Sequence, residues 1–144
     1  MARFQARPNF KAVNIVKDML YNGDLKKLAD THLVAPIVRR TGAGMDQNNR
    51  PFKPLGRRHA QYKLRRLGHS RADLRLSGAM LGSMRTKQVT KRQARIGFSS
   101  GAMERRASSN EDLGRRFMSP DAVMVANFRR ALVKRLRLKN RRRA

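Results

Sequence analysis

The sequence contains no cysteine and no tryptophan, and its acidic residues are scarce. Among 144 residues, 35 are Lys or Arg and only 9 are Asp or Glu, which gives a formal net charge of +26 at pH 7. Without cysteine the chain can form neither a disulfide nor a thiolate zinc site, and it is compatible with a reducing compartment. The three histidines, His32, His59 and His69, lack the spacing of metal ligands, so we expect no metal site.

Long hydrophobic runs are also missing. The sequence has no run of about eighteen apolar residues, so we expect no membrane-spanning helix and no membrane partner. Its first residues, Met-Ala-Arg-Phe-Gln-Ala-Arg-Pro, lack the apolar centre of a secretory signal, so none is expected. A chain of this length is too short for two independent cores, which predicts one domain.

Residues suited to catalysis are equally scarce. We find no P-loop, no dinucleotide-binding fingerprint and no His-Glu metal motif. Between Asp30 and Glu104 the only acids are Asp46 and Asp73, which leaves little material for a paired-carboxylate mechanism. The four residues from Asp46 superficially resemble a calcium loop, but the required glycine and distal glutamate are absent. We therefore predict a protein that is not an enzyme and uses no cofactor.

The chain does contain apolar residues in periodic groups, which a disordered basic tail would not show. Helical spacing from Asn9 onward predicts a long N-terminal helix, with Asn22-Gly23 as a break and Asp24 as a new cap. Pro36 is expected to kink or end this helix, and Gly42 and Gly44 to finish it. Residues 41–58, which are rich in Gly, Asn, Asp and Pro, predict an ordered loop of turns.

The second half of the chain predicts a short helix, a hairpin and a terminal helix. Ser77 can cap the short helix, and alternation over residues 84–89 and 94–99 predicts two antiparallel strands. Residues 100–114 are predicted to be loop or weak helix. Ser119-Pro120-Asp121 predicts a helix start with Ser119 as the cap. The buried residues expected to support the core or assembly are Phe52, Met80, Leu81, Met84, Phe98 and Phe117.

These elements predict an α+β fold. It would comprise a long N-terminal helix, a small antiparallel sheet with a short helix, a C-terminal helix and a basic tail. We assign residues 1–138 to a single domain and residues 139–144 to a basic C-terminal arm.

Positive charge gathers in two regions. After Asp121 there is no further acid, and nine cations occupy the last sixteen residues. In residues 57–67, helical spacing would place several cations and Tyr62 near one face. This face would either contact phosphates, with Tyr62 against sugar or base, or be solvated, with Tyr62 turned inward. The candidate contacts with nucleic acid or an acidic partner are Arg57, Arg58, Arg65, Arg66, Lys91, Arg92, Arg141, Arg142 and Arg143.

A series of short motifs in order resembles the phage tail-completion and head-tail joining (neck) proteins of the virion-morphogenesis type. The resemblance covers roughly residues 9 to 138. The matching positions are Asp46, Pro51-Phe52-Lys53-Pro54, Tyr62-Lys63, Asp73-Leu74, Ser77-Gly78, Met80-Leu81, Ile96-Gly97-Phe98 and Arg116-Phe117.

The resemblance implies a small α+β body that assembles into a homo-oligomeric ring at the neck or tail top of a tailed phage. Its partners would be the portal or connector and tail proteins. It would be located in the virion after assembly in the host cytoplasm, and packaged DNA would pass through the ring. A sequence-independent contact with that DNA is left open. The family pattern does not account for a charge of +26. Composition alone supports an alternative, a basic ribosomal or nucleoid protein that binds nucleic-acid phosphates.

Overall fold

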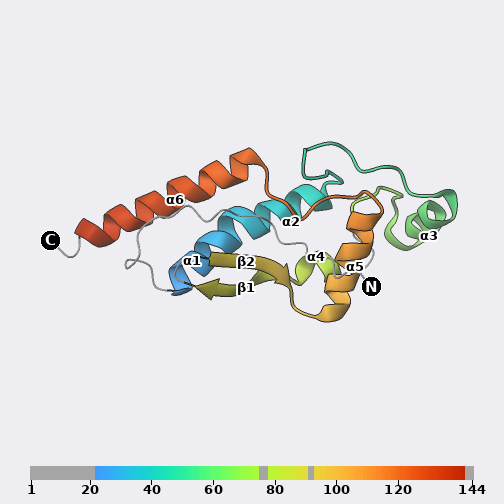
Figure 1. Ribbon diagram of the computed structural model, residues 1–144. Coiled ribbons are helices and arrows are strands. Elements are labelled where there is room, and N and C mark those ends of the chain that lie inside the picture. Colours follow the sequence, from blue (N-terminus) through green and yellow to red (C-terminus); the bar gives the residue numbers. More distant parts are fainter. Residues whose placement is uncertain (1–21, 75–77, 91–92, 142–144) are drawn as a thin grey trace.

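The computed structural model describes residues 22–74, 78–90 and 93–141, and these form a small α+β fold (Figure 1). The predicted fold class is therefore confirmed. The elements in chain order are α1 (Asn22–Ala29), the π-helical turn η1 (Asp30–Val34), α2 (Ala35–Gly42), α3 (Arg57–Leu67), α4 (Ala79–Gly82), β1 (Met84–Thr90), β2 (Gln93–Phe98), α5 (Gly101–Asp112) and α6 (Ala122–Arg141).

The first three elements form one continuous helical run that Pro36 does not end. A proline ring collides with the carbonyl four residues earlier in a regular α-helix. The π turn η1 ends at Val34, two residues before Pro36, and changes the spacing there, with the Ala35 N–H donating to the Asp30 carbonyl five residues back. The helix ends at Gly42, as predicted. Asp24 lies inside α1 and is not a cap; the predicted helix before residue 22 lies outside the described residues.

The two strands form the predicted antiparallel hairpin. Met84 lies opposite Phe98, and the register shifts between Thr86 and Gln88, which produces a bulge at Lys87. The side chain of Lys87 lies over Gly97, where a β-carbon would come within 2.9 Å of it. The hairpin joins the helical run through Asp30, whose carboxylate accepts hydrogen bonds from the N–H (3.0 Å) and hydroxyl (2.6 Å) of Thr86.

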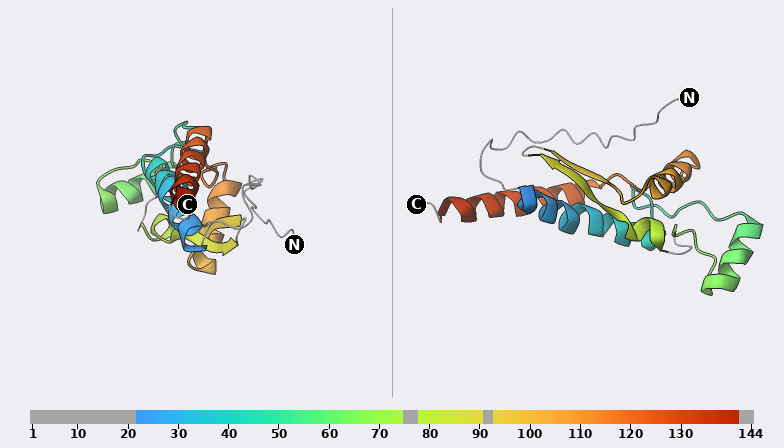
Figure 2. Two further views of the ribbon diagram at one scale, coloured as in Figure 1. Left: turned by 90° about the vertical axis from the view of Figure 1, so that its left-hand side faces the viewer. Right: turned by 90° about the horizontal axis from the view of Figure 1, so that it is seen from below.

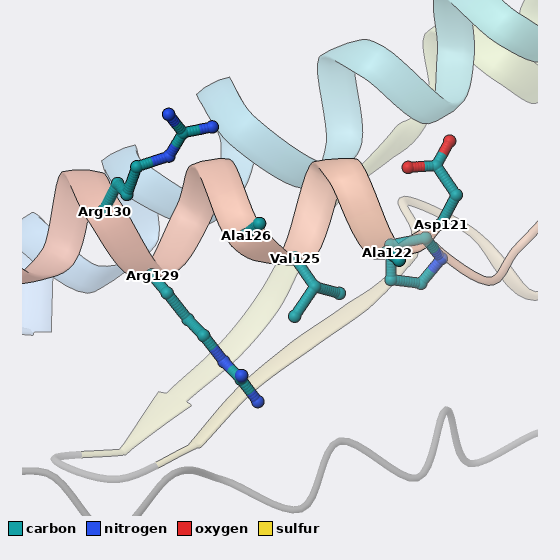
Figure 3. Close-up of a pocket in the computed structure, with 7 residues that line it drawn as sticks. Asp121, Ala122, Val125, Ala126, Arg129 and Arg130 are labelled. Carbon is teal, nitrogen blue, oxygen red and sulfur yellow. The ribbon is translucent and has the colours of Figure 1, made fainter.

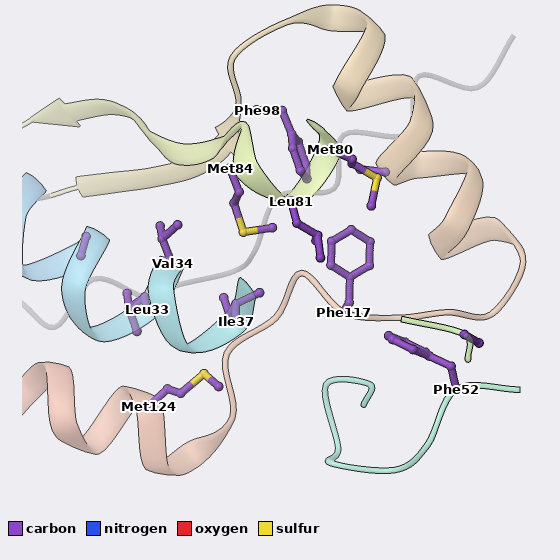
Figure 4. Packing of buried hydrophobic residues seen from close by; sticks show 13 residues of the cluster. Leu33, Val34, Ile37, Phe52, Met80, Leu81, Met84, Phe98, Phe117 and Met124 are labelled. Atoms are coloured by element: carbon purple, nitrogen blue, oxygen red, sulfur yellow. The ribbon is translucent and has the colours of Figure 1, made fainter. Parts of the chain in front are cut away.

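The main core lies between the helical run, α4, the hairpin and the segment before α6 (Figure 4). Phe117 and Phe98 are almost completely buried at its centre, and Leu81 points toward Phe117 from α4. A smaller cluster, made of Leu25, Leu132 and Leu136, holds α6 against α1. The residues expected in the core from the sequence, Phe52, Met80, Leu81, Met84, Phe98 and Phe117, are all buried. Their role in assembly stays a prediction.

In the second half, one prediction left two alternatives open and another was wrong. Residues 101–112 form the regular helix α5, capped by Ser100, which is the helical alternative of the prediction for residues 100–114. The cap of α6 is Asp121 and not Ser119, because the Met124 N–H donates to Asp121 Oδ1 at 2.9 Å. Pro120 therefore lies one residue before the cap and is not the first residue of the helix.

The molecule is elongated, with different helices at its two ends. α6 runs alongside α1 and η1 toward one end, whereas α3 lies at the opposite end, away from the sheet (Figures 1 and 2). α6 continues to Arg141, three residues beyond the predicted domain boundary at 138. The assignment of residues 139–144 to an arm stays a prediction.

Candidate binding surfaces

The acidic side chains serve the fold, which leaves much of the positive surface unopposed. Seven acids in the described ranges accept structural hydrogen bonds or pair with specific cations. They are Asp24, Asp30, Asp46, Asp73, Glu104, Glu111 and Asp121. Asp46, for example, accepts the N–H groups of Asn48 and Arg50 within its loop, and Glu111 at the end of α5 accepts those of Phe117 and Met118. Most exposed Lys and Arg side chains therefore face solvent without a carboxylate partner, and such a surface attracts anions.

Arg40 is a buried cation with a structural task. Its Nη2 donates to the carbonyls of Phe117 (2.8 Å) and Ser119 (2.7 Å), and its Nη1 lies 3.5 Å from Asp121 Oδ2. These contacts tie the end of α2 to the segment that precedes α6. A planar guanidinium can satisfy several acceptors at once, as this position requires. Arg40 therefore belongs to the fold and is not available to a partner.

Burial and the contact between Arg40 and Asp121 together shift the pKa of both side chains. Burial lowers the pKa of the Arg40 guanidinium, while the charge and hydrogen bonding of Asp121 oppose that effect. Burial alone would raise the pKa of Asp121, but the hydrogen bonds from Met124 N–H and Asn49 and the charge of Arg40 bring it below its ordinary value. The lowered pKa keeps the Asp121 carboxylate ionised at neutral pH, as its contact with Arg40 requires.

α3 is anchored by a buried ion pair in place of a hydrophobic face. Its Lys63 ammonium pairs with the Asp73 carboxylate, and both side chains are almost fully buried. Lys63 also donates to the Arg71 carbonyl at 2.6 Å, and His69 Nε2 lies 3.7 Å from the second oxygen of Asp73. Lys63 is the one buried residue of α3. The helix is therefore joined to the segment that follows it.

The cations expected on residues 57–67 are brought together on α3. Arg57, Arg58, Arg65 and Arg66 are all exposed. Tyr62 is 46% exposed, accepts a hydrogen bond from Arg66 Nη1 at 2.9 Å, and has its ring 6.5 Å from that of His59. The interpretation in which Tyr62 turns inward is therefore wrong. Contact of this face with nucleic acid stays a prediction.

Away from Arg58, Tyr62 and Arg65, α3 carries two exposed leucines. Leu64 is 51% exposed and Leu67 38% exposed, and the two lie one turn apart on the same face. No apolar side chain of α3 is buried against the described part of the molecule. This pair is the apolar face of α3.

A second surface lies along α6. An open cleft of about 610 Å³ follows its first turns, with Pro120, Ala122 and Val125 among its lining residues (Figure 3). Arg129 and Arg130 border the cleft and point to opposite sides of the helix (Figure 3). Asp121 is the one acid that lines this cleft. Its carboxylate pairs with Arg40 and caps α6, so among the lining residues no carboxylate is left to act as an acid or base.

Further along α6, three exposed cations continue from this cleft. Arg130, Lys134 and Arg137 follow one another at intervals of four and three residues, which places them on one face. The sequence showed how many cations the terminal region holds but not which of them face outward. The spacing of Arg130, Lys134 and Arg137 in the sequence indicates one shared face, but that this face points outward follows only from the buried residues of α6.

Several predicted contact residues lie outside the described part of the chain. These are Lys91, Arg92, Arg142 and Arg143. Arg141 belongs to α6, but its side chain is not described. Of the predicted contact residues, the structure therefore describes the side chains of the four arginines of α3 alone, and it places them on one helix.

The described residues contain no group of three or more side chains suited to hold a metal ion. Among the described helices, none combines the length and the apolar character needed to cross a membrane. A scan against protein-family models found no match, and searches of curated proteins and of solved structures found none either.

Proposed function

We propose that this protein is a structural component of a tailed-phage virion, without enzymatic activity. In this proposal it forms a homo-oligomeric ring at the neck or tail top, joins the head connector to the tail, and lets DNA pass. The series of motifs that resembles those of neck proteins supports this proposal, as does the small α+β body.

The observation that carries the proposal is the uncovered apolar face of α3. An isolated helix of 11 residues is marginal in water, so α3 depends on contacts made by its sides. Its own chain supplies an ion pair at Lys63 but leaves Leu64 and Leu67 exposed. Because α3 lies at one end of an elongated molecule, a neighbouring subunit can cover this face (Figure 2). A contact of one subunit's end with a different surface of the next forms a ring when the rotation between subunits closes, and an open filament when it does not.

The test measures the mass and shape of the full-length protein by sedimentation velocity and negative-stain electron microscopy. We expect closed rings, and we expect the double substitution Leu64→Ser and Leu67→Ser to convert them to monomers. Leu113→Ser is the matched control, because Leu113 is 64% exposed and lies elsewhere, at the end of α5. A protein that stays monomeric at all concentrations, even with portal and tail proteins present, would contradict the proposal.

A second candidate function is that of a basic ribosomal or nucleoid protein. The observation that favours it is the unopposed positive surface described above. It predicts a monomer that binds RNA or DNA with strong salt dependence and no preference for sequence. The sedimentation experiment separates the two candidates, because only the first requires a ring.

A further inference from the structure

We propose that the outward face of α6 carries a phosphate-binding track, made of Arg130, Lys134 and Arg137, that binds the nucleic-acid backbone without reading its sequence. The track goes beyond the ring proposal by assigning nucleic-acid contact to one helix. The track depends on the ring proposal in one respect: the ring proposal is what identifies the bound nucleic acid as packaged DNA.

The inner face of α6 fixes which side chains point outward. Met124, Leu132 and Leu136 are buried against the rest of the molecule. Residues 130, 134 and 137 lie on the other side of the helix and are exposed. The first and last of them are seven positions apart, or about 10 Å along the helix axis, and so the track offers one cation every 4 to 6 Å or so. One DNA strand presents a phosphate about every 3.4 Å of axis, so several phosphates lie within reach of the track.

The track is held by a helix that is itself fixed. α6 packs against α1 and η1, and Arg135, on another side of α6 from the track, pairs with Asp24 of α1 at 3.0 Å. At the start of the track, Arg130 Nη2 donates to Asn127 Oδ1 at 2.7 Å, which restrains the guanidinium. No acid follows Asp121 in the sequence, so α6 contributes no carboxylate that could neutralise the track. Because the helix backbone is fixed, no backbone entropy is lost when phosphates bind to the track.

The surroundings of the track favour nucleic acid over an acidic protein. A protein interface has an apolar centre with a polar rim. On α6 the exposed apolar residues Val123, Val133 and Leu138 are separated by charged residues and form no such centre. The apolar pair on α3 is contiguous by contrast, which is why α3 is assigned to a protein neighbour.

The test measures binding of the full-length protein to a random-sequence DNA duplex by fluorescence anisotropy over a series of salt concentrations. The test variant carries Arg130→Gln, Lys134→Gln and Arg137→Gln. Each phosphate contact contributes about 0.9 to the slope of log affinity against log salt, so the variant should lose about 2 to 3 from that slope. The loss should be equal for duplexes of unrelated sequence.

A matched control removes the same charge elsewhere. Arg105→Gln, Arg106→Gln and Arg116→Gln lie on α5 and the segment after it, and all three side chains are exposed. This variant shares the net charge of the test variant, so any difference between them reports the position of the cations. We expect the control to keep nearly the full slope.

Two results would overturn the proposal. One is an α6 variant that binds DNA as the α5 control does. The other is equal binding of poly-glutamate and DNA, with equal loss in the α6 variant, which would assign the track to acidic polypeptides. Measuring the ring-breaking Leu64→Ser and Leu67→Ser variant in parallel separates this test from the ring. If the α6 variant loses DNA binding and the Leu64→Ser and Leu67→Ser variant keeps it, the result supports the track, whether or not a ring forms.

Discussion

The Lys63 ammonium and the Asp73 carboxylate form an ion pair with only 4% and 2% of their side chains exposed. Lys63 lies in the middle of α3, and Asp73 lies beyond the end of that helix. Together with the bond from Lys63 to the Arg71 carbonyl, the pair closes α3 and the following segment into a loop. The position of the apolar face of α3 therefore depends on a buried charge pair, because no apolar side chain of α3 is buried within the described residues.

Lys63→Met should be strongly destabilising because it leaves the Asp73 carboxylate buried without its cation. Breaking one partner of a buried pair costs about 3–5 kcal/mol, whereas replacing both by apolar residues is far less costly. We therefore expect the double variant Lys63→Met and Asp73→Leu to recover most of the loss in urea unfolding experiments. A double variant as unstable as the single one would show that the pair does not act as a unit.

Arg40→Met should also lower the free energy of unfolding, by about 2–4 kcal/mol. It leaves the carbonyls of Phe117 and Ser119 without their donor and removes the cation beside Asp121. Arg40→Lys should restore only part of this loss, because one ammonium cannot reproduce the planar fork of donors. Arg39→Met at the exposed neighbouring position is the control and should stay within about 0.5 kcal/mol of the wild type. Equal effects of the Arg39 and Arg40 variants would contradict the role assigned to Arg40.

Stability should fall in acid partly through Asp121. Its pKa in the folded protein lies below the ordinary value of 3.8, so the folded state binds fewer protons than the unfolded state in that range. Its contribution is therefore fully present above about pH 3.8 and is lost as the pH falls through the folded pKa. Asp121→Asn retains a capping oxygen but does not titrate. The stability gap between wild type and this variant, measured by urea unfolding across pH, should shrink in acid; a constant gap would contradict the assignment.

Much of the fold could be predicted because local patterns determine it. The hairpin followed from alternation of apolar and polar residues, and Phe52, set between two prolines, was recognised as buried. The errors arose where a tertiary or local contact decides the outcome. Pro36 is accommodated by a π turn, and Asp121 caps α6 while also facing Arg40. Neither effect can be read from periodicity.

The candidate surfaces were only partly predictable for a related reason. Residues 57–67 form a helix with exposed arginines, as their spacing indicated. That its Lys63 would be buried, with Leu64 and Leu67 left outside, depends on a partner ten residues away, Asp73. The track on α6 required knowledge of which face of the helix meets α1. Counting charges gives their number, whereas the packing decides which of them face outward.

The contact between Asp30 and Thr86 should make a measurable contribution because it joins the π turn to the bulged strand. Asp30→Ala removes the acceptor for the N–H and the hydroxyl of Thr86, whose side chain is almost fully buried, and should cost about 2–3 kcal/mol. Asp30→Asn keeps an acceptor oxygen and loses only the charge, so it should cost about half as much. Urea unfolding measures both values, and hydrogen exchange at the Thr86 amide should accelerate most in the alanine variant. Thr86→Val keeps the backbone bond and removes the hydroxyl, which separates the two contributions. Equal losses for the alanine and asparagine variants would mean that the charge of Asp30, and not its hydrogen bonding, holds the hairpin to the helix.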